Sequence, residues 1–245
     1  MEFTYAPLDS KENFTCETWK AFSYINIEDY RKCLTWKPDE SFWPIQGMRH
    51  TIHQNLLNSS SLIVELGGNI GTDIMEFMRL YNSSIISFEP IRSMAMKLKA
   101  GFRAYPTVEI RPYGLGNRAR NLTVELFDSS NAGTSMFREL SGRNSTYVQI
   151  QILDIIEVIN HIRKTRTQNG IIDMLTINCE GCEFEVLPAL ILNNMIQYFR
   201  IIQFGSHTTL VSQSTCIYCQ IQQALRRTHK IRYHFTMLWE GWILK

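Results

Sequence analysis

The feature that most constrains the fold of this 245-residue chain is an apolar run that breaks into a glycine-rich turn. Residues 62–66, Leu-Ile-Val-Glu-Leu, lead into residues 67–72, Gly-Gly-Asn-Ile-Gly-Thr, and then into a helix-like stretch over residues 73–78. A second apolar run, residues 85–88, follows at the distance of one crossover helix. Strand, tight turn, helix and strand in this order predict the first half of a nucleotide-binding βαβ unit.

The turn and the end of the second strand carry the residues expected to hold an adenosine ligand. Gly67 and Gly71 can adopt backbone angles that a side chain disfavours, and they let the main chain approach a ligand closely. Glu89 follows the second strand, about 20 residues after the glycines, where an acid accepts hydrogen bonds from ribose hydroxyls. The candidate cofactor-binding residues are Glu65, Gly67, Gly68, Asn69, Gly71, Thr72, Glu89 and Pro90.

The glycine spacing distinguishes between classes of nucleotide-binding protein. Gly67, Gly68 and Gly71 do not give the G-x-G-x-x-G spacing of dinucleotide-binding folds, so a dehydrogenase is a distant alternative. The E-x-G-x-x-x-G pattern that begins at Glu65 is similar to the turn of S-adenosylmethionine-dependent methyltransferases. A plain strand-to-helix turn is the structural alternative, and Glu89 in register weakens it.

The rest of the chain alternates apolar runs with helical periodicity. Strands are expected at residues 108–110, 122–127, 171–177, 199–204, 231–235 and 238–244, and helices at residues 91–102, 155–163, 184–192 and 217–229. Asp154 is placed to cap the helix that follows it. The pattern predicts an α/β fold with a doubly wound, Rossmann-like, mostly parallel sheet over residues 61–245. We expect residues 1–60 to form a small helical extension that packs on the sheet and either covers the acceptor pocket or only braces the sheet.

Together these motifs resemble the FkbM family of methyltransferases, which are class I S-adenosylmethionine-dependent enzymes. The resemblance covers about residue 62 to the C-terminus, and its motifs are the glycine turn, Phe88-Glu89-Pro90, Leu153-Asp154 and Glu180-Gly181-Cys182-Glu183 with Leu187. It implies S-adenosylmethionine as the cofactor. It also implies O-methylation of a hydroxyl group on a small molecule, a glycan or a lipid.

Three positions depart from the resemblance. Thr176 and Asn178 stand where the family usually carries a lysine and an aspartate, and Gln203 stands where it commonly carries a glutamate. We expect these positions at the rim where acceptor and methyl donor meet. The missing charges favour either an altered catalytic set or a catalytically inactive protein that uses the fold for binding or scaffolding.

A neutral alcohol is a poor nucleophile and normally needs a proton acceptor. The candidate catalytic residues are Glu180, Glu183 and His207. An exposed loop histidine, and glutamates favoured by a helix dipole, are the structural alternatives. The segment of residues 129–135, rich in serine and threonine, either lines the cofactor pocket or is an ordinary polar loop.

Charge and hydropathy exclude some partners. The net charge of +2 and the pI near 8.2 give no sign of a nucleic-acid footprint. The chain has no apolar run of the length needed to cross a membrane, and residues 1–20 lack the hydrophobic segment of a signal peptide.

Cysteines and sequons bear on the compartment. Five N-x-S/T sequons, at Asn13, Asn58, Asn82, Asn121 and Asn144, stand against roughly two expected from composition. With an even count of six cysteines they tilt the expectation toward a secreted or lumenal protein, with the cytoplasm as the alternative. We expect a disulfide from Cys182 to Cys216 or Cys219. Free thiols and a zinc site formed by the two C-x-x-C pairs are the alternatives.

Overall fold

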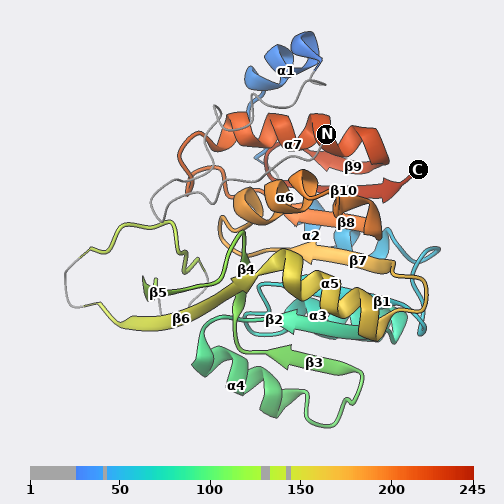
Figure 1. Cartoon of the computed structure of the whole chain (residues 1–245), viewed down its shortest axis with the longest axis vertical. Helices are drawn as coiled ribbons and strands as arrows, with labels where there is room; N and C mark the ends of the chain where they lie inside the picture. The colour runs from blue at the N-terminus through green and yellow to red at the C-terminus, as the bar shows by residue number, and fades with distance from the viewer. Residues whose placement is uncertain (1–25, 41–42, 128–132, 142–144) are drawn as a thin grey trace.

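The computed structural model describes residues 26–40, 43–127, 133–141 and 145–245 (Figure 1). The strands of its main sheet are β1 (Leu62–Leu66), β2 (Ser84–Phe88), β3 (Val108–Arg111), β7 (Ile172–Ile177), β8 (Phe199–Gly205), β9 (His229–Phe235) and β10 (Trp239–Leu244). Its helices are α1 (Ile27–Leu34), α2 (Trp43–Thr51), α3 (Thr72–Tyr81), α4 (Arg92–Gly101), α5 (Ile155–Arg166), α6 (Glu183–Leu192), the short 3-10 helix η2 (Ile196–Tyr198) and α7 (Ser214–Thr228). None of the helices within these ranges combines the length and apolar character needed to span a bilayer.

The main sheet has the strand order β3-β2-β1-β7-β8-β10-β9. Strands β3, β2, β1, β7 and β8 pair in parallel, and β10 lies antiparallel between β8 and β9. The chain therefore moves outward from β1 in one direction and then in the other, which puts a topological switch point beside β1. This arrangement confirms the predicted Rossmann-like, mostly parallel α/β sheet.

Both faces of the sheet are covered because the central strands are apolar on each side. Successive residues of a strand point to opposite faces. Val64 and Leu175 pack into the cluster that contains the buried residues of α5, α6 and α7, whereas Ile63 and Met174 pack with α3 and α4. Figure 1 shows α5 and α6 in front of the sheet and α3 behind it.

A second, three-stranded sheet lies beside the carboxyl edge of the main sheet (Figure 1). It consists of β4 (Gly114–Gly116), β5 (Arg120–Glu125) and β6 (Tyr147–Asp154) in the order β4-β6-β5. The sequence predicted only the strand near β5. Val124 and Ile152 of this sheet pack against Met94 at the start of α4. The small sheet is thereby fixed as a wall over the ends of β1 and β2.

The predicted cap of α5 is confirmed. Asp154 ends β6 and its Oδ1 accepts a hydrogen bond from the Ile156 main-chain nitrogen at 2.7 Å. The side chain thus satisfies one of the main-chain donors that the first turn of a helix leaves free.

The two described helices of the N-terminal extension attach to different parts of the molecule. Helix α1 packs on α7. Helix α2 lies next to α3, where Arg49 and His50 both contact the Asp73 carboxylate. Ile45 of α2 is fully buried against the β9–β10 hairpin. The described part of residues 1–60 therefore contains two helices joined to turns and loops, and its division from the sheet domain stays a prediction.

The cysteine pairing differs from the prediction. Cys33 bonds to Cys219 with 5.7 Å between the Cα atoms, and Cys179 bonds to Cys182 with 5.4 Å between them. A bond from Cys182 to Cys216 or Cys219 is therefore wrong. The reason is that Cys219 faces α1, while Cys182 is held beside Cys179 by the turn before α6. Cys216 is also disulfide-bonded, and the described residues include no free cysteine and no metal-binding cluster.

Candidate active site

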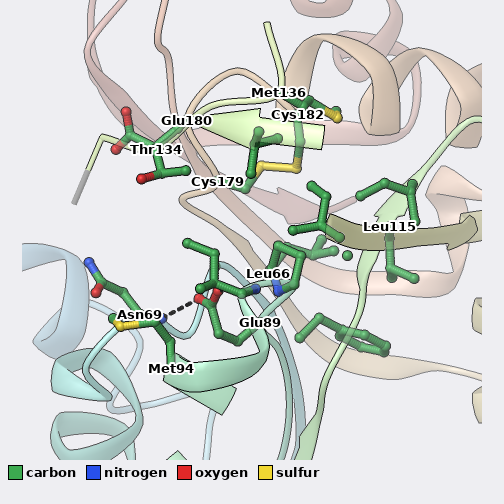
Figure 2. Close-up of a pocket in the computed structure, with 18 of the residues that line it drawn as sticks. Leu66, Asn69, Glu89, Met94, Leu115, Thr134, Met136, Cys179, Glu180 and Cys182 are labelled. Carbon is green, nitrogen blue, oxygen red and sulfur yellow. Dashed lines mark hydrogen bonds between the residues drawn. A yellow bond between two sulfur atoms is a disulfide. The ribbon is translucent and has the colours of Figure 1, made fainter. Parts of the chain in front are cut away.

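A pocket lies at the carboxyl ends of β1 and β2, next to the small sheet (Figure 2). Leu66 and Phe88 end these two strands and form the base of the pocket. Val124, Ile150 and Ile152 line the side formed by the small sheet. The pocket therefore lies at the switch point, where open α/β sheets bind ligands. Its apolar wall is suited to a planar base.

Glu89 supplies a carboxylate to this pocket. The residue is only 5% exposed, and its two oxygens accept hydrogen bonds from the main-chain nitrogens of Asn69 and Ile91, both at 2.8 Å. Burial raises the pKa of the Glu89 carboxyl, and the two main-chain donors act in the opposite direction. Each carboxylate oxygen has capacity for a further donor, so Glu89 can bind a pair of hydroxyl groups.

The glycine turn brings main chain and Asn69 to the pocket. Gly67 has a φ of 96°, and a Cβ atom there would lie 1.9 Å from the Asn178 carbonyl oxygen, so the close approach requires glycine. Asn69 lines the pocket with a φ of 43°. Its side-chain Oδ1 is buried and has no hydrogen-bond partner among the described residues. Because buried polar atoms are normally paired, this acceptor fits a site for a polar ligand.

Other predicted cofactor residues build the turn and do not line the pocket. Pro90 lines it together with Glu89, but Gly68, Gly71 and Thr72 are not part of the lining. Gly71 has a φ of 86° and immediately precedes α3, and a Cβ atom there would lie 2.7 Å from the ring of Phe102. Its role is therefore close packing of the turn against α4.

Glu65 lies beneath the turn and not in the pocket lining. Its carboxyl is 2% exposed and accepts a hydrogen bond from the Ser87 hydroxyl of the neighbouring strand. Burial raises the pKa of Glu65 to about 8, and the charge of Asp73 acts in the same direction. This buried acid supports the turn from below.

Thr176 and Gln203 do not lie at the rim, which corrects the expectation from the sequence. They are 1% and 0% exposed, and Gln203 donates a hydrogen bond to Thr176 at 3.0 Å. Gln203 also contacts His53 and accepts from the Tyr233 hydroxyl, both at 3.1 Å. The reason is the two-residue period of the strands, which turns both side chains toward α2. Of the three departing positions, Asn178 is the one that lines the pocket.

The polar network around Gln203 is neutral. Burial lowers the pKa of His53 to about 4, so the imidazole carries no charge near pH 7. Thr176 and Gln203, two of the three departing positions, therefore belong to an uncharged hydrogen-bond network behind the pocket.

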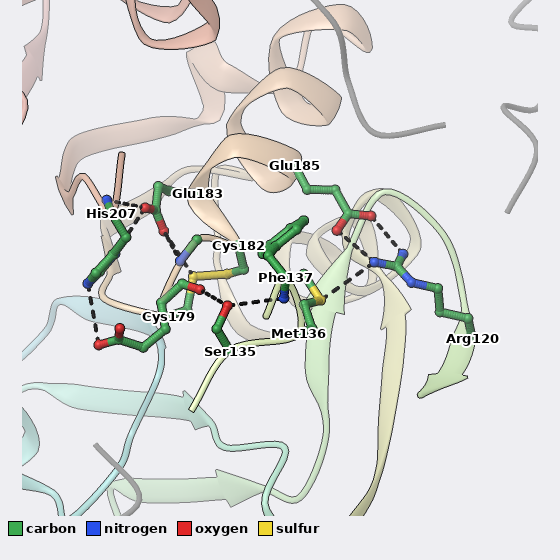
Figure 3. Close-up of a disulfide and its surroundings, with 11 residues drawn as sticks. Arg120, Ser135, Met136, Phe137, Cys179, Cys182, Glu183, Glu185 and His207 are labelled. Atoms are coloured by element: carbon green, nitrogen blue, oxygen red, sulfur yellow. Dashed lines mark hydrogen bonds and ion pairs between the residues drawn. A yellow bond between two sulfur atoms is a disulfide. The ribbon is translucent and has the colours of Figure 1, made fainter. Parts of the chain in front are cut away.

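The three predicted catalytic residues lie together at the start of α6 (Figure 3). The His207 Nδ1 is 2.9 Å from Glu183 Oε1, and the His207 Nε2 is 3.4 Å from Glu180 Oε1. The main-chain nitrogen of His207 also donates to Glu183 Oε1 at 2.7 Å. Glu183 is fully buried at the first position of α6. Of the three residues, Glu180 is the one that lines the pocket.

The charges in this cluster give His207 and Glu180 different protonation states at neutral pH. Burial opposes a charge on His207, but the carboxylates of Glu183 and Glu180 outweigh it and raise the pKa of His207 to about 10. Burial also acts to raise the pKa of Glu180, but His207 and the more distant Arg138 bring it below the ordinary value. At neutral pH His207 is therefore a cation that cannot accept a proton, and Glu180 is a carboxylate that can.

The polar segment of residues 129–135 reaches the pocket, as one of its two predicted alternatives had it. Gly133 and Thr134 line the pocket, and residues 129–132 lie outside the described ranges. Met94 and the residues of the small sheet that line the pocket were not predicted. They reach the pocket because the small sheet folds over the strand ends, and no local motif marks them.

No protein-family model and no curated protein matches the chain, so the FkbM resemblance rests on the sequence motifs alone. Solved structures with a similar fold include an O-methyltransferase from Bacillus cereus in complex with S-adenosylhomocysteine, at 11% identity and a TM-score of 0.46, covering 94% of this chain and 100% of that one. An rRNA methylase from Streptococcus thermophilus has 10% identity and a TM-score of 0.46, covering 81% and 93%. Aeropyrum pernix fibrillarin with bound S-adenosyl-L-methionine has 9% identity and a TM-score of 0.44, covering 80% and 74%.

Proposed function

We propose that this chain is an S-adenosylmethionine-dependent methyltransferase that methylates a hydroxyl group on a small molecule, a glycan or a lipid. The observation that carries the proposal is the pocket at the switch point, with the Glu89 carboxylate inside it and an unpaired Asn69 oxygen beside it. Glu89 would hold the ribose hydroxyls, and Gly67 and Asn69 would contact the rest of the cofactor. The apolar wall of the small sheet would contact the base.

S-adenosylmethionine, when bound, supplies the methyl group and leaves as S-adenosylhomocysteine. The chain's own task is to position the acceptor and to remove the hydroxyl proton. Glu180 suits this second task because it is ionised and lines the pocket. His207 cannot act as the base while it is protonated, so it orients Glu180 and keeps it charged.

The alternative is a protein that keeps the pocket for binding or scaffolding without catalysis. The neutral groups at residues 176, 178 and 203 favour it. The burial of Thr176 and Gln203 behind the pocket weakens it, because their replacement removes no charge from the pocket itself.

The first test is calorimetric titration of the folded protein with S-adenosylhomocysteine. Wild type should bind saturably, and Glu89→Ala should weaken binding about ten-fold or more, as the loss of hydrogen bonds to a charged group predicts. Glu157→Ala, which removes an exposed carboxylate from α5, is the matched control and should bind like wild type. Absence of binding by folded wild type would reject the proposal.

A second test separates catalysis from binding. With an acceptor found by screening, Glu180→Gln should retain S-adenosylhomocysteine binding and lose most of its methyl transfer, because the amide cannot accept the proton. Retained binding without any transfer by wild type across a broad hydroxyl screen would favour the scaffolding alternative.

We also propose that the chain folds in an oxidising, secretory compartment. The described disulfides support this, and so do the sequon asparagines Asn58, Asn82 and Asn121, which are all exposed. Asn13 and Asn144 lie outside the described residues. Expression through a secretory pathway should give a product whose mass falls on treatment with an N-glycosidase. An unchanged mass and six free thiols in the native source would favour the cytoplasm.

A further inference from the structure

Residues 179–182, which lie between β7 and α6 and include Glu180, form a turn with an unusual backbone. Its ends, Cys179 and Cys182, are joined by a disulfide, and both line the pocket. Between them Glu180 has a φ of 55° and Gly181 a φ of 105°. The left-handed region is disfavoured for a residue with a side chain. Glu180 therefore keeps this conformation only because its surroundings restrain it.

The same turn determines where both carboxylates of the cluster point (Figure 3). The Glu180 carbonyl oxygen accepts a hydrogen bond from the Ser135 hydroxyl at 2.6 Å. The Gly181 main-chain nitrogen donates to Glu183 Oε2 at 3.1 Å, which leaves Glu183 Oε1 for His207. A change of backbone at residues 180 and 181 would therefore move Glu180 away from His207 and free one oxygen of Glu183.

Besides these hydrogen bonds, a covalent bond and side-chain packing restrain this turn. The covalent bond joins Cys179 and Cys182. The packing is close, because a Cβ atom at Gly181 would lie 2.8 Å from the Phe137 ring and 3.2 Å from Val211. Packing of this kind keeps the turn close to its neighbours, but it does not fix the separation of its two ends. A disulfide does, because it limits how far apart the two Cα atoms can lie.

We propose that the Cys179–Cys182 disulfide is a positioning element of the active site, which holds Glu180 in its left-handed conformation and its carboxylate against His207 at the edge of the pocket. The geometric part of this inference stands on the turn itself. Its consequence for proton removal rests on the proposed methyltransferase function. The disulfide takes no part in bond making, and its sulfur atoms act through the position of Glu180.

The test is the titration of the His207 ring, followed by NMR in the full chain and assigned with His207→Asn. The charged groups that act on this cluster are Glu180, Glu183 and, through Glu180, Arg138. In Cys179→Ser/Cys182→Ser the titration midpoint should fall by about one pH unit or more, because the Glu180 contact is lost. Cys33→Ser/Cys219→Ser is the matched control, since it removes the other described disulfide, and its midpoint should equal that of wild type.

A double-mutant comparison distinguishes positioning from general loosening. Glu180→Gln alone should lower the midpoint by a similar amount. Added to Cys179→Ser/Cys182→Ser it should lower the midpoint no further, because the contact it removes is already broken. Additive shifts would overturn the proposal, as would a wild-type midpoint in the folded Cys179→Ser/Cys182→Ser protein.

Two provisions keep these outcomes decisive. If Cys179→Ser/Cys182→Ser does not fold, the folded wild type is reduced with a phosphine under mild conditions instead. Alkylation and mass spectrometry identify which cysteine pair was reduced. The titration midpoint of the His207 ring is then measured on this reduced protein. S-adenosylhomocysteine binding is measured on the same wild-type sample. A midpoint that moves as expected in a protein that does not bind this ligand rejects the proposed function and leaves the positioning role intact.

Discussion

The two described disulfides differ in what they join and in what they surround. Cys33–Cys219 connects residues 186 apart in sequence and ties α1 to α7, whereas Cys179–Cys182 spans a separation of three. In the chain-entropy model the longer loop stabilises the folded state by about 5 kcal/mol and the shorter one by about 1.5 kcal/mol. Global stability and the shape of the site therefore depend on different covalent links.

Their surroundings reinforce this difference. Cys33 and Cys219 are 2% and 0% exposed within the largest core cluster. Cys179 is half-buried, and it lines the pocket together with Cys182. A small reductant that enters the pocket can reach the short disulfide without unfolding the chain, but it reaches the long one only when the core opens.

The largest expected effect comes from breaking the long disulfide. Cys33→Ser/Cys219→Ser should lose about 3–5 kcal/mol of unfolding free energy, because the unfolded chain regains the freedom of a long loop. Urea denaturation without reductant measures this loss. S-adenosylhomocysteine affinity, measured at a temperature where the variant is folded, should stay within about two-fold of wild type. If this variant also lost affinity for S-adenosylhomocysteine, global stability and the shape of the site would not depend on separate disulfides.

A non-covalent link near the short disulfide should have the next largest effect. Arg120 of β5 makes two hydrogen bonds to the Glu185 carboxylate of α6, at 2.6 and 2.7 Å. Because Glu185 is buried, Arg120→Ala leaves a charge without its partner and should cost about 3 kcal/mol in urea denaturation. Arg79→Ala, which breaks an exposed ion pair with Glu76, is the control and should leave the unfolding free energy close to that of wild type.

The short disulfide itself should contribute less to stability. Cys179→Ser/Cys182→Ser should lose about 1.5 kcal/mol of unfolding free energy, well below the loss from the long disulfide. Of the two disulfide variants, Cys179→Ser/Cys182→Ser should nevertheless be the one in which methyl transfer falls, because Glu180 moves away from His207. Denaturation and turnover measured on the same preparations decide this point. A stability loss as large as that of the long disulfide would remove the distinction between them.

Local features could be predicted from the sequence, and long-range ones could not. The glycine turn, Glu89 and the Asp154 cap each depend on a few consecutive residues, and the structure places Glu89 in the pocket and confirms the cap. Strand β4 has three residues, two of them glycine, and therefore has no periodicity to detect. Because neither β4 nor its partner β6 could be predicted from the sequence, the small sheet and the pocket wall that it forms could not be predicted either.

Contacts between side chains that are far apart in the sequence could not be predicted either. Spacing alone cannot decide disulfide connectivity, so the bond between Cys33 and Cys219 could not be found. The burial of Gln203 depends on His53 and Tyr233, which are 150 and 30 residues away in sequence. Glu180, Glu183 and His207 were named from the sequence only as candidate proton acceptors, and it is the fold that brings them together.

The smallest expected effect is a pH dependence that belongs to the short-disulfide region alone. The pKa of His207 rises from 6.5 to about 10 on folding, so its ion pairs stabilise the fold fully below pH 6.5 and lose this effect as the pH rises through about 10. Wild type should exceed His207→Asn by about 1 kcal/mol near pH 6, a modest value because water screens the partly exposed ring. The difference should shrink toward zero as the pH approaches about 10.

Urea denaturation of both proteins across this pH range measures the difference, with His161→Asn, at an exposed position on α5, as the matched histidine control. The profile also distinguishes the two disulfides. Removing Cys33–Cys219 should lower every point equally and preserve the slope, since Glu180 and Glu183, which form ion pairs with the His207 ring, belong to neither α1 nor α7. Removing Cys179–Cys182 should flatten the slope, because Glu180 no longer holds the proton on His207. Equal slopes in the two variants would mean that packing around Gly181 alone positions the cluster.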